Sequence, residues 1–174
     1  MFKTRLLSGI VLVILAFLFI VSGGTVLLAS TLVISCIGMF ELYRIYKVER
    51  SPIAFAGYLA AVLFYANLKW NFIPDILMLV LGFLIVLMFL YVFSYPKYKA
   101  DQIMAVFFGM FYVAAMLSYV YQIRMLDRGL YLAFLVFFCS WGCDTCAYCV
   151  GMLIGKHKMS PKLSPKKSIE GAVG

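Results

Sequence analysis

The stretch LLSGIVLVILAFLFIVSGGTVLLASTLVISCIGMF, residues 6–40, decides the fold because it runs for 35 residues without a charged side chain. A bilayer core takes roughly 20 residues of helix, so this run is too long for a single crossing. Ser22, Gly23 and Gly24 in its middle favour a turn. The stretch therefore predicts two membrane-spanning helices joined by a tight connection.

More uncharged runs follow along the chain. They cover residues 51–68, 76–96 and 102–123, with 18, 21 and 22 residues, and a further apolar segment near 130–151 is interrupted only by Asp144. Hydrophobic residues make up 66% of the chain and charged residues 13%, which would leave a soluble protein too little polar surface. We therefore predict an all-α polytopic transmembrane protein, a single membrane domain over 1–174. Its six predicted helices cover about 6–22, 25–43, 52–68, 76–94, 103–122 and 130–151, with a lysine-rich loop over 152–174.

The first helix needs a separate test, because Lys3 and Arg5 precede an apolar segment as they would in a signal peptide. No small-residue cleavage site follows, so we expect the helix to be retained.

Basic residues predict the orientation. Counting six crossings from a cytoplasmic N-terminus places twelve lysines and arginines inside and three outside, as the positive-inside rule requires. Both termini and the lysine-rich loop are therefore predicted to be cytoplasmic. The three outside residues are Lys69, Arg124 and Arg128; the twelve inside are Lys3, Arg5, Arg44, Lys47, Arg50, Lys97, Lys99, Lys156, Lys158, Lys162, Lys166 and Lys167.

The net charge of +8 does not indicate nucleic acid, because the charges are spread over loops and no aromatic stacking platform accompanies them. Anionic lipid headgroups and small anionic substrates fit better as partners. The sequence leaves the oligomeric state open, and a homodimer is one arrangement that it permits.

Cysteines in the last apolar segment have a spacing that resembles iron–sulfur ligands, C-x2-C-x2-C. At 100° per residue they lie on one side of a helix, away from Asp144. We interpret them as small packing residues at a helix contact. They are Cys139, Cys143, Cys146 and Cys149.

Asp144 is the only acid that interrupts a predicted crossing. Tyr148, Gly151 and Gly155 fall on the same side of the helix. An intramembrane carboxylate costs roughly 2.5 to 3.5 kcal/mol on insertion scales, so it usually faces a cavity, a partner or an ion. The alternative is an interfacial Asp144 that is hydrated or pairs with a lysine. Gly151 and Gly155 form a G-x-x-x-G pair that permits close approach of another backbone or a substrate.

The lysine-rich loop favours phosphate binding, although its spacing is one residue short of a Walker loop. Ser164 followed by Pro165 predicts a helix N-cap with proline at the first helical position. Lys166 and Lys167 would then lie in the first turn, where free amides and positive charge attract an anion. The alternative is a juxtamembrane basic segment that lies on anionic lipids.

The pattern Asp144-x3-Tyr148-x2-Gly151-x3-Gly155-Lys156-His157-Lys158, followed by Pro161, Ser164-Pro165-Lys166-Lys167-Ser168 and Glu170-Gly171, resembles the core of the phosphatidate cytidylyltransferases, the CDP-diacylglycerol synthases. The close match covers about 137–174. The resemblance implies a multi-pass enzyme of the cytoplasmic membrane in phospholipid biosynthesis. Such an enzyme joins CTP to phosphatidate, releases pyrophosphate and CDP-diacylglycerol, and requires Mg²⁺.

The resemblance also implies roles for individual residues. Asp144, Lys166 and Lys167 would be catalytic, with Asp144 as a Mg²⁺ ligand, since a carboxylate is a hard oxygen donor. The lysines would spread the charge of two reacting anions. The residues expected to bind substrate are Tyr148, Lys156, His157, Lys158, Ser164, Pro165, Ser168, Glu170 and Gly171.

The chain stops at Gly174, inside the glycine-rich end of this motif. The family continues into further hydrophobic helices and an Asp-Arg-x-Asp motif that supplies metal-binding aspartates, so we expect this chain to be incomplete or inactive alone. Two other functions remain open. One is a CTP-dependent transferase that acts on a different lipid, and the other is a membrane scaffold or transporter with Asp144 as an ion relay.

Overall fold

In the computed structural model, residues 2–160 and 164–173 are described, the side chains of 2–6, 8, 160, 165 and 166 excepted. The chain divides into two compact units, Met1–Asp127 and Arg128–Gly174. Each unit has its own secondary structure and packing.

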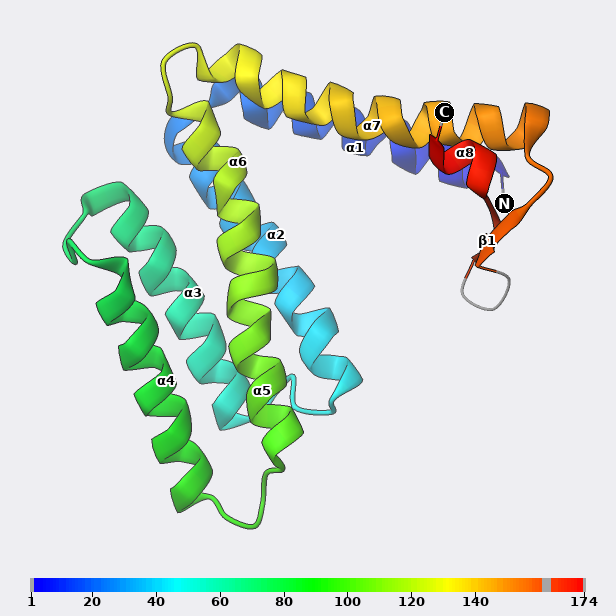
Figure 1. The fold of residues 1–174 in the computed structure, drawn as a ribbon. Coiled ribbons are helices and arrows are strands. Elements are labelled where there is room, and N and C mark those ends of the chain that lie inside the picture. Colours follow the sequence, from blue (N-terminus) through cyan, green and yellow to red (C-terminus); the bar gives the residue numbers. More distant parts are fainter. Residues whose placement is uncertain (1, 161–163, 174) are drawn as a thin grey trace. The chain divides into compact units, whose positions relative to one another are not determined.

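In the first unit, the apolar helices α2 to α6 form a bundle, and α1 runs away from it (Figure 1). Its α5, η1 and α6 follow one another without a break, as one helical run from Ala100 to Arg124. The elements are α1 (Phe2–Ser22), α2 (Gly24–Ile45), α3 (Pro52–Trp70), α4 (Ile76–Phe93), α5 (Ala100–Gly109), the π-helical η1 (Met110–Ala115) and α6 (Met116–Arg124).

The helix connections follow local sequence signals. Gly23 and Gly24 take φ values of 61° and 47°, the left-handed region that glycine enters at little cost, and the predicted turn between the first two helices is confirmed. Ser51 caps α3 by accepting a hydrogen bond from the amide of Ala54 at 3.3 Å, with Pro52 at the first helical position.

Tyr43 lies at the centre of this bundle and is fully buried. Its hydroxyl donates to the carbonyl of Val106 at 3.0 Å, which satisfies a polar atom in an apolar core. A Cβ placed on Gly57 would lie 2.5 Å from the Tyr43 hydroxyl, and one on Gly109 would lie 2.6 Å from its ring. Two glycines thus make room for one aromatic ring between α2, α3 and α5.

A second buried polar contact accompanies the π-helical segment. The hydroxyl of Tyr65 lies 2.9 Å from Oγ of Ser35 and donates to the carbonyl of Ala114 at 3.2 Å. A wider π turn leaves carbonyls available to such donors, because each amide bonds one residue further back.

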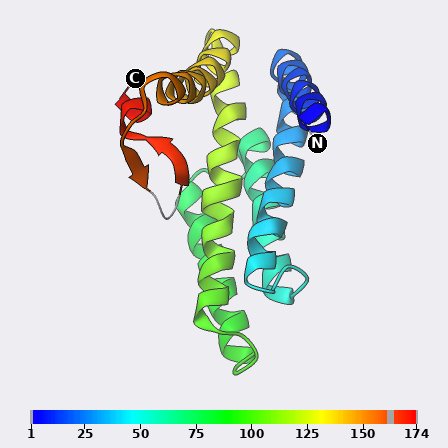
Figure 2. The same ribbon diagram turned by 90° about the vertical axis from the view of Figure 1, so that its right-hand side faces the viewer.

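The second unit contains α7 (Gly129–Ile154), β1 (Lys158–Ser160), β2 (Ser164–Ser168) and α8 (Ile169–Val173). The two strands are antiparallel, with Lys158 opposite Ser168 and Ser160 opposite Ser164. Figure 2 shows this pair joined to α8, which packs on the C-terminal end of α7.

The predicted helix start at Ser164 and Pro165 is wrong, and Lys166 and Lys167 lie on β2 and not in a first helical turn. The helix begins four residues later, where Oγ of Ser168 accepts the amide of Gly171 at 3.2 Å. Ser164 instead pairs with β1. The backbone bonds between two short segments therefore outweigh the local capping signal.

Five helices are long and apolar enough to cross a membrane, by length and composition: α2, α3, α4, the run Ala100–Arg124 and α7. The apolar part of α1 for which side chains are described is shorter, Gly9–Ser22. The prediction of an all-α multi-pass membrane protein is confirmed, while a crossing by α1 and the orientation of the termini stay predictions.

Candidate functional site

The candidate site lies where α7 ends and the hairpin turns back toward it. Ser168 is buried, with 7% of its surface exposed, against three glycines. A Cβ on Gly151 would lie 2.9 Å from Oγ of Ser168, and a Cβ on Gly155 would lie 2.5 Å from that atom. A Cβ on Gly171 would lie 2.6 Å from the carbonyl oxygen of Ala147. The close approach predicted for the G-x-x-x-G pair is therefore present. The groups that approach are the Ser168 side chain at the end of β2 and the backbone of Gly171 on α8.

Glu170 fixes the chain that leaves α7. Its carboxylate accepts the amide of Lys156 at 3.1 Å and the amide of His157 at 3.2 Å. Nδ1 of His157 lies 2.6 Å from the same carboxylate, and the amide of Ile169 donates to the His157 carbonyl at 2.9 Å. The His157 side chain, then the backbone amides, lower the pKa of Glu170 to about 2. Glu170 is therefore an ionised acceptor that organises a backbone reversal.

The lysines around this reversal face outward. Lys156, Lys158 and Lys167 are exposed, and none of them forms an ion pair within the described part of the chain. Lys158 lies on β1 opposite Ser168, and Lys167 lies on β2, so the two cations belong to the two strands of one hairpin. These lysine side chains, which have no ion-pair partner among the described residues of the hairpin, are therefore available to bind an anion.

The structure describes fewer contacts for the other predicted site residues. Ser164 is half-buried at the start of β2. The side chains of Pro165 and Lys166 lie outside the described residues, as does Pro161 of the resemblance.

Asp144 and Tyr148 lie on α7, N-terminal to the hairpin, and both are exposed. Asp144 is roughly 16 Å along the helix axis from Gly155, at 1.5 Å per residue. Asp144 forms no ion pair with any described residue. The described residues also contain no group of three or more His, Cys, Asp or Glu side chains that could hold a metal ion. One carboxylate does not make a complete Mg²⁺ site, which needs further oxygen ligands.

All four cysteines of α7 are exposed in the structure. Their interpretation as packing residues at a helix contact stays a prediction.

The fold and the site together define a multi-pass helical membrane protein whose last long helix carries a basic hairpin at its end. A cytidylyltransferase family model matches residues 3–174. The chain belongs to the cytidylyltransferase family.

Several bacterial proteins are similar to this chain. The phosphatidate cytidylyltransferase of Bacillus subtilis (strain 168) is 30% identical over 181 residues, and that of Staphylococcus aureus (strain COL) is 30% identical over 178. The phosphatidate cytidylyltransferase of Staphylococcus haemolyticus is 26% identical over 175 residues. Each match covers 99% of this chain and 66% of the relative's length. No solved structure matches the chain.

Proposed function

We propose that this chain contributes to a phosphatidate cytidylyltransferase, which converts CTP and phosphatidate to CDP-diacylglycerol and pyrophosphate. Family membership supports the cytidylyl chemistry, and the names of the similar proteins support phosphatidate as the acceptor. The observation that carries the proposal is the hairpin at the end of α7, where Glu170 orders the backbone beside exposed lysines.

The proposed reaction joins two anions. A phosphate oxygen of phosphatidate attacks the α-phosphorus of CTP, and the bond from that phosphorus to the oxygen bridging the β-phosphorus breaks. Pyrophosphate leaves with the bonding electrons, and no net proton transfer is needed. Cations positioned beforehand lower the electrostatic cost of bringing the two phosphates together.

In this proposal Lys158 and Lys167 hold substrate phosphates, because both are exposed on the hairpin. Lys156, whose backbone amide donates to Glu170, provides a third positive charge for the phosphates. Lys166 is proposed to provide a fourth. Ser168 and Gly171 are assigned positioning roles, since their close packing fixes the hairpin against α7.

Asp144 is proposed as one oxygen ligand of Mg²⁺, exposed on α7. The other ligands would be waters, substrate phosphates and residues outside the described set, because Mg²⁺ is usually bound in this shared way. The proposed place of the reaction is the cytoplasmic face of the cell membrane, where soluble CTP meets a lipid that stays in the leaflet.

The test measures Mg²⁺-dependent formation of CDP-diacylglycerol from labelled CTP and phosphatidate. The chain is assayed alone and with the remaining part of the Bacillus subtilis relative appended. In the extended protein, Asp144→Asn and Lys167→Ala should each lower kcat/KM on the order of a hundredfold. Lys69→Ala is the matched control, because it removes one lysine charge in the other unit and should leave the rate unchanged.

Two results would count against the proposal. One is loss of activity in Lys69→Ala as large as in Lys167→Ala, which would indicate a general charge effect. The other is absence of product from folded, membrane-inserted extended protein, which would favour a scaffold or transporter.

A further inference from the structure

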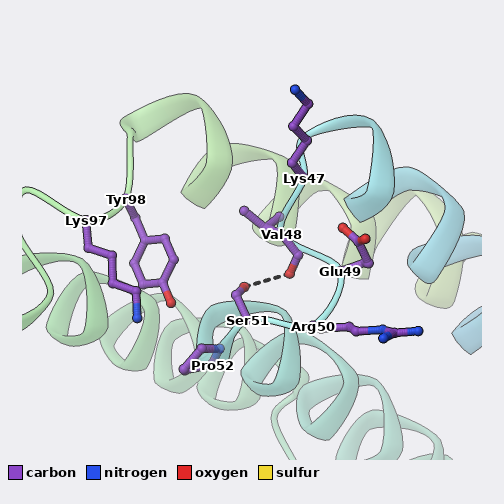
Figure 3. A pocket seen from close by; sticks show the side chains of 8 residues that line it. All are labelled: Lys47, Val48, Glu49, Arg50, Ser51, Pro52, Lys97 and Tyr98. Atoms are coloured by element: carbon purple, nitrogen blue, oxygen red, sulfur yellow. Dashed lines mark hydrogen bonds between the residues drawn. The ribbon is translucent and has the colours of Figure 1, made fainter.

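Two loops at one end of the first unit line an open cavity of about 390 Å³. One loop joins α2 to α3 and supplies the segment Lys47–Pro52, and the other joins α4 to α5 and supplies Lys97 and Tyr98 (Figure 3). Its size lies within the range of small-molecule sites.

Tyr98 supplies the feature that most needs an explanation. Its side chain is 7% exposed, and its hydroxyl is the one buried side-chain polar atom without a hydrogen-bond partner in the described part of the chain. Figure 3 shows the ring beside Lys97, with the hydroxyl turned toward the side of the cavity formed by Ser51 and Pro52. Burying a hydroxyl without a hydrogen-bond partner costs free energy. An unbonded hydroxyl at this position therefore points to a ligand that accepts its hydrogen bond.

The cavity wall is cationic. Lys47, Arg50 and Lys97 are exposed, and Glu49 is the single opposing acid. Nζ of Lys97 lies 5.4 Å from the centroid of the Tyr98 ring. Figure 3 shows Lys47 and Arg50 extended outward, and neither forms an ion pair with any described residue. Their long, flexible side chains can turn toward an anion.

Two residues that line the cavity also have unbonded backbone amides. The amides of Glu49 and Arg50 bond no acceptor among the described residues. The hydroxyl of Ser51 is already committed, because it donates to the Val48 carbonyl at 2.6 Å and caps α3. Free amides, cations and one hydroxyl donor are together the chemistry that recognises a phosphate.

The position of the cavity favours a lipid over a soluble phosphate. It lies where apolar helices end, and exposed Tyr46 and Tyr95 flank its two loops, as aromatic side chains do at membrane interfaces. We propose that this cavity binds the phosphate of an anionic phospholipid, with Tyr98 donating from the floor and Arg50, Lys47 and Lys97 closing over it. This site is separate from the hairpin of the second unit and does not depend on the function proposed there.

The test reconstitutes the whole chain in phosphatidylcholine nanodiscs doped with phosphatidylglycerol and measures retained phosphatidylglycerol by native mass spectrometry after detergent release. Arg50→Gln should lower retention roughly tenfold, as expected for a charge-assisted hydrogen bond. Lys69→Gln is the matched control, because it removes the same charge at the opposite end of α3 and should leave retention unchanged.

Tyr98→Phe separates ligand binding from a structural role. Because the hydroxyl has no internal partner, its removal should raise the thermal midpoint of the lipid-free protein and yet lower phosphatidylglycerol retention several-fold. A purely structural tyrosine would not give these opposite changes.

Three results would overturn the proposal. Equal losses in Arg50→Gln and Lys69→Gln would indicate general attraction to an anionic surface. Unchanged retention in folded Tyr98→Phe and Arg50→Gln would remove the site. Displacement of phosphatidylglycerol by millimolar inorganic phosphate, in detergent, would assign the cavity to a soluble phosphate.

Discussion

Oε1 of Glu170 lies 2.6 Å from Nδ1 of His157, which ties the first turn of α8 to the chain that leaves α7. The same carboxylate accepts the amides of Lys156 and His157. These contacts occupy Glu170 entirely within the protein, so we assign it to positioning of the lysines and not to contact with substrate. His157 is 76% exposed, so its ring is held by this contact and not by burial.

Glu170 should make the hairpin sensitive to acid. Its folded-state pKa, about 2, lies below the usual 4.5, so its contribution is complete above pH 4.5 and is lost as the pH falls toward 2. Hydrogen exchange in detergent should show that protection of the Lys156 and His157 amides falls over this window. In Glu170→Gln the protection should be low at every pH, since a neutral amide accepts these bonds more weakly.

Glu41→Gln serves as the control for that experiment, because Glu41 is exposed on α2 in the other unit. Its exchange profile at the hairpin should match the wild type. An acid-dependent loss of protection that persists in Glu170→Gln would assign the effect to another group.

Gly171→Ala should detach the hairpin from α7. A Cβ there would lie 2.6 Å from the Ala147 carbonyl and 3.0 Å from Cα of Gly151, and backbone atoms cannot move aside as a flexible side chain can. We expect a destabilisation of about 1–3 kcal/mol and faster proteolysis of the hairpin. Gly142→Ala is the matched control on α7, because nothing lies within 4 Å of its Cβ position and alanine favours helix. Equal proteolysis of both variants would contradict the close packing.

The sequence predicts the helices well because each one is a long uncharged run, and a bilayer leaves the backbone few alternatives. The turn at Gly23 and Gly24 was predicted because it depends on local residue chemistry. The cap at Ser51 is equally local but was not predicted. The hairpin could not be predicted from the sequence. Its ladder joins β1 to β2, and each strand is too short to show a periodic pattern.

The candidate site could be predicted in part. The motif identified the residues, and the G-x-x-x-G pair indicated a close approach, but the partner that approaches is a five-residue helix with no sequence signal of its own. The π-helical segment was not predicted either. The Tyr65 hydroxyl that bonds its Ala114 carbonyl comes from another helix, so this contact has no local sequence signal.

Tyr43→Phe should destabilise the first unit by about 0.5–1.5 kcal/mol, the usual net value of one buried hydrogen bond. The loss should stay within this range, because the Val106 carbonyl keeps its helical partner, the amide of Met110. Thermal or denaturant unfolding in detergent measures it. Tyr112→Phe removes the same atom from an exposed ring and should be neutral. Equal destabilisation by both variants would show that the hydrogen bond of Tyr43 does not itself stabilise the fold.

The predicted orientation can be tested with single cysteines in a cysteine-free background. Lys69 follows the apolar part of α3 and Lys99 precedes α5, so the two positions mark opposite ends of the first unit. The excess of basic residues at the Lys99 end predicts that this end is cytoplasmic. A membrane-impermeant maleimide added to intact spheroplasts should therefore label Lys69→Cys and not Lys99→Cys, and disruption of the membrane should make both reactive. Labelling of Lys99→Cys in intact spheroplasts would reverse the orientation. It would also place both the cavity beside Tyr98 and the proposed lipid phosphate in the outer leaflet.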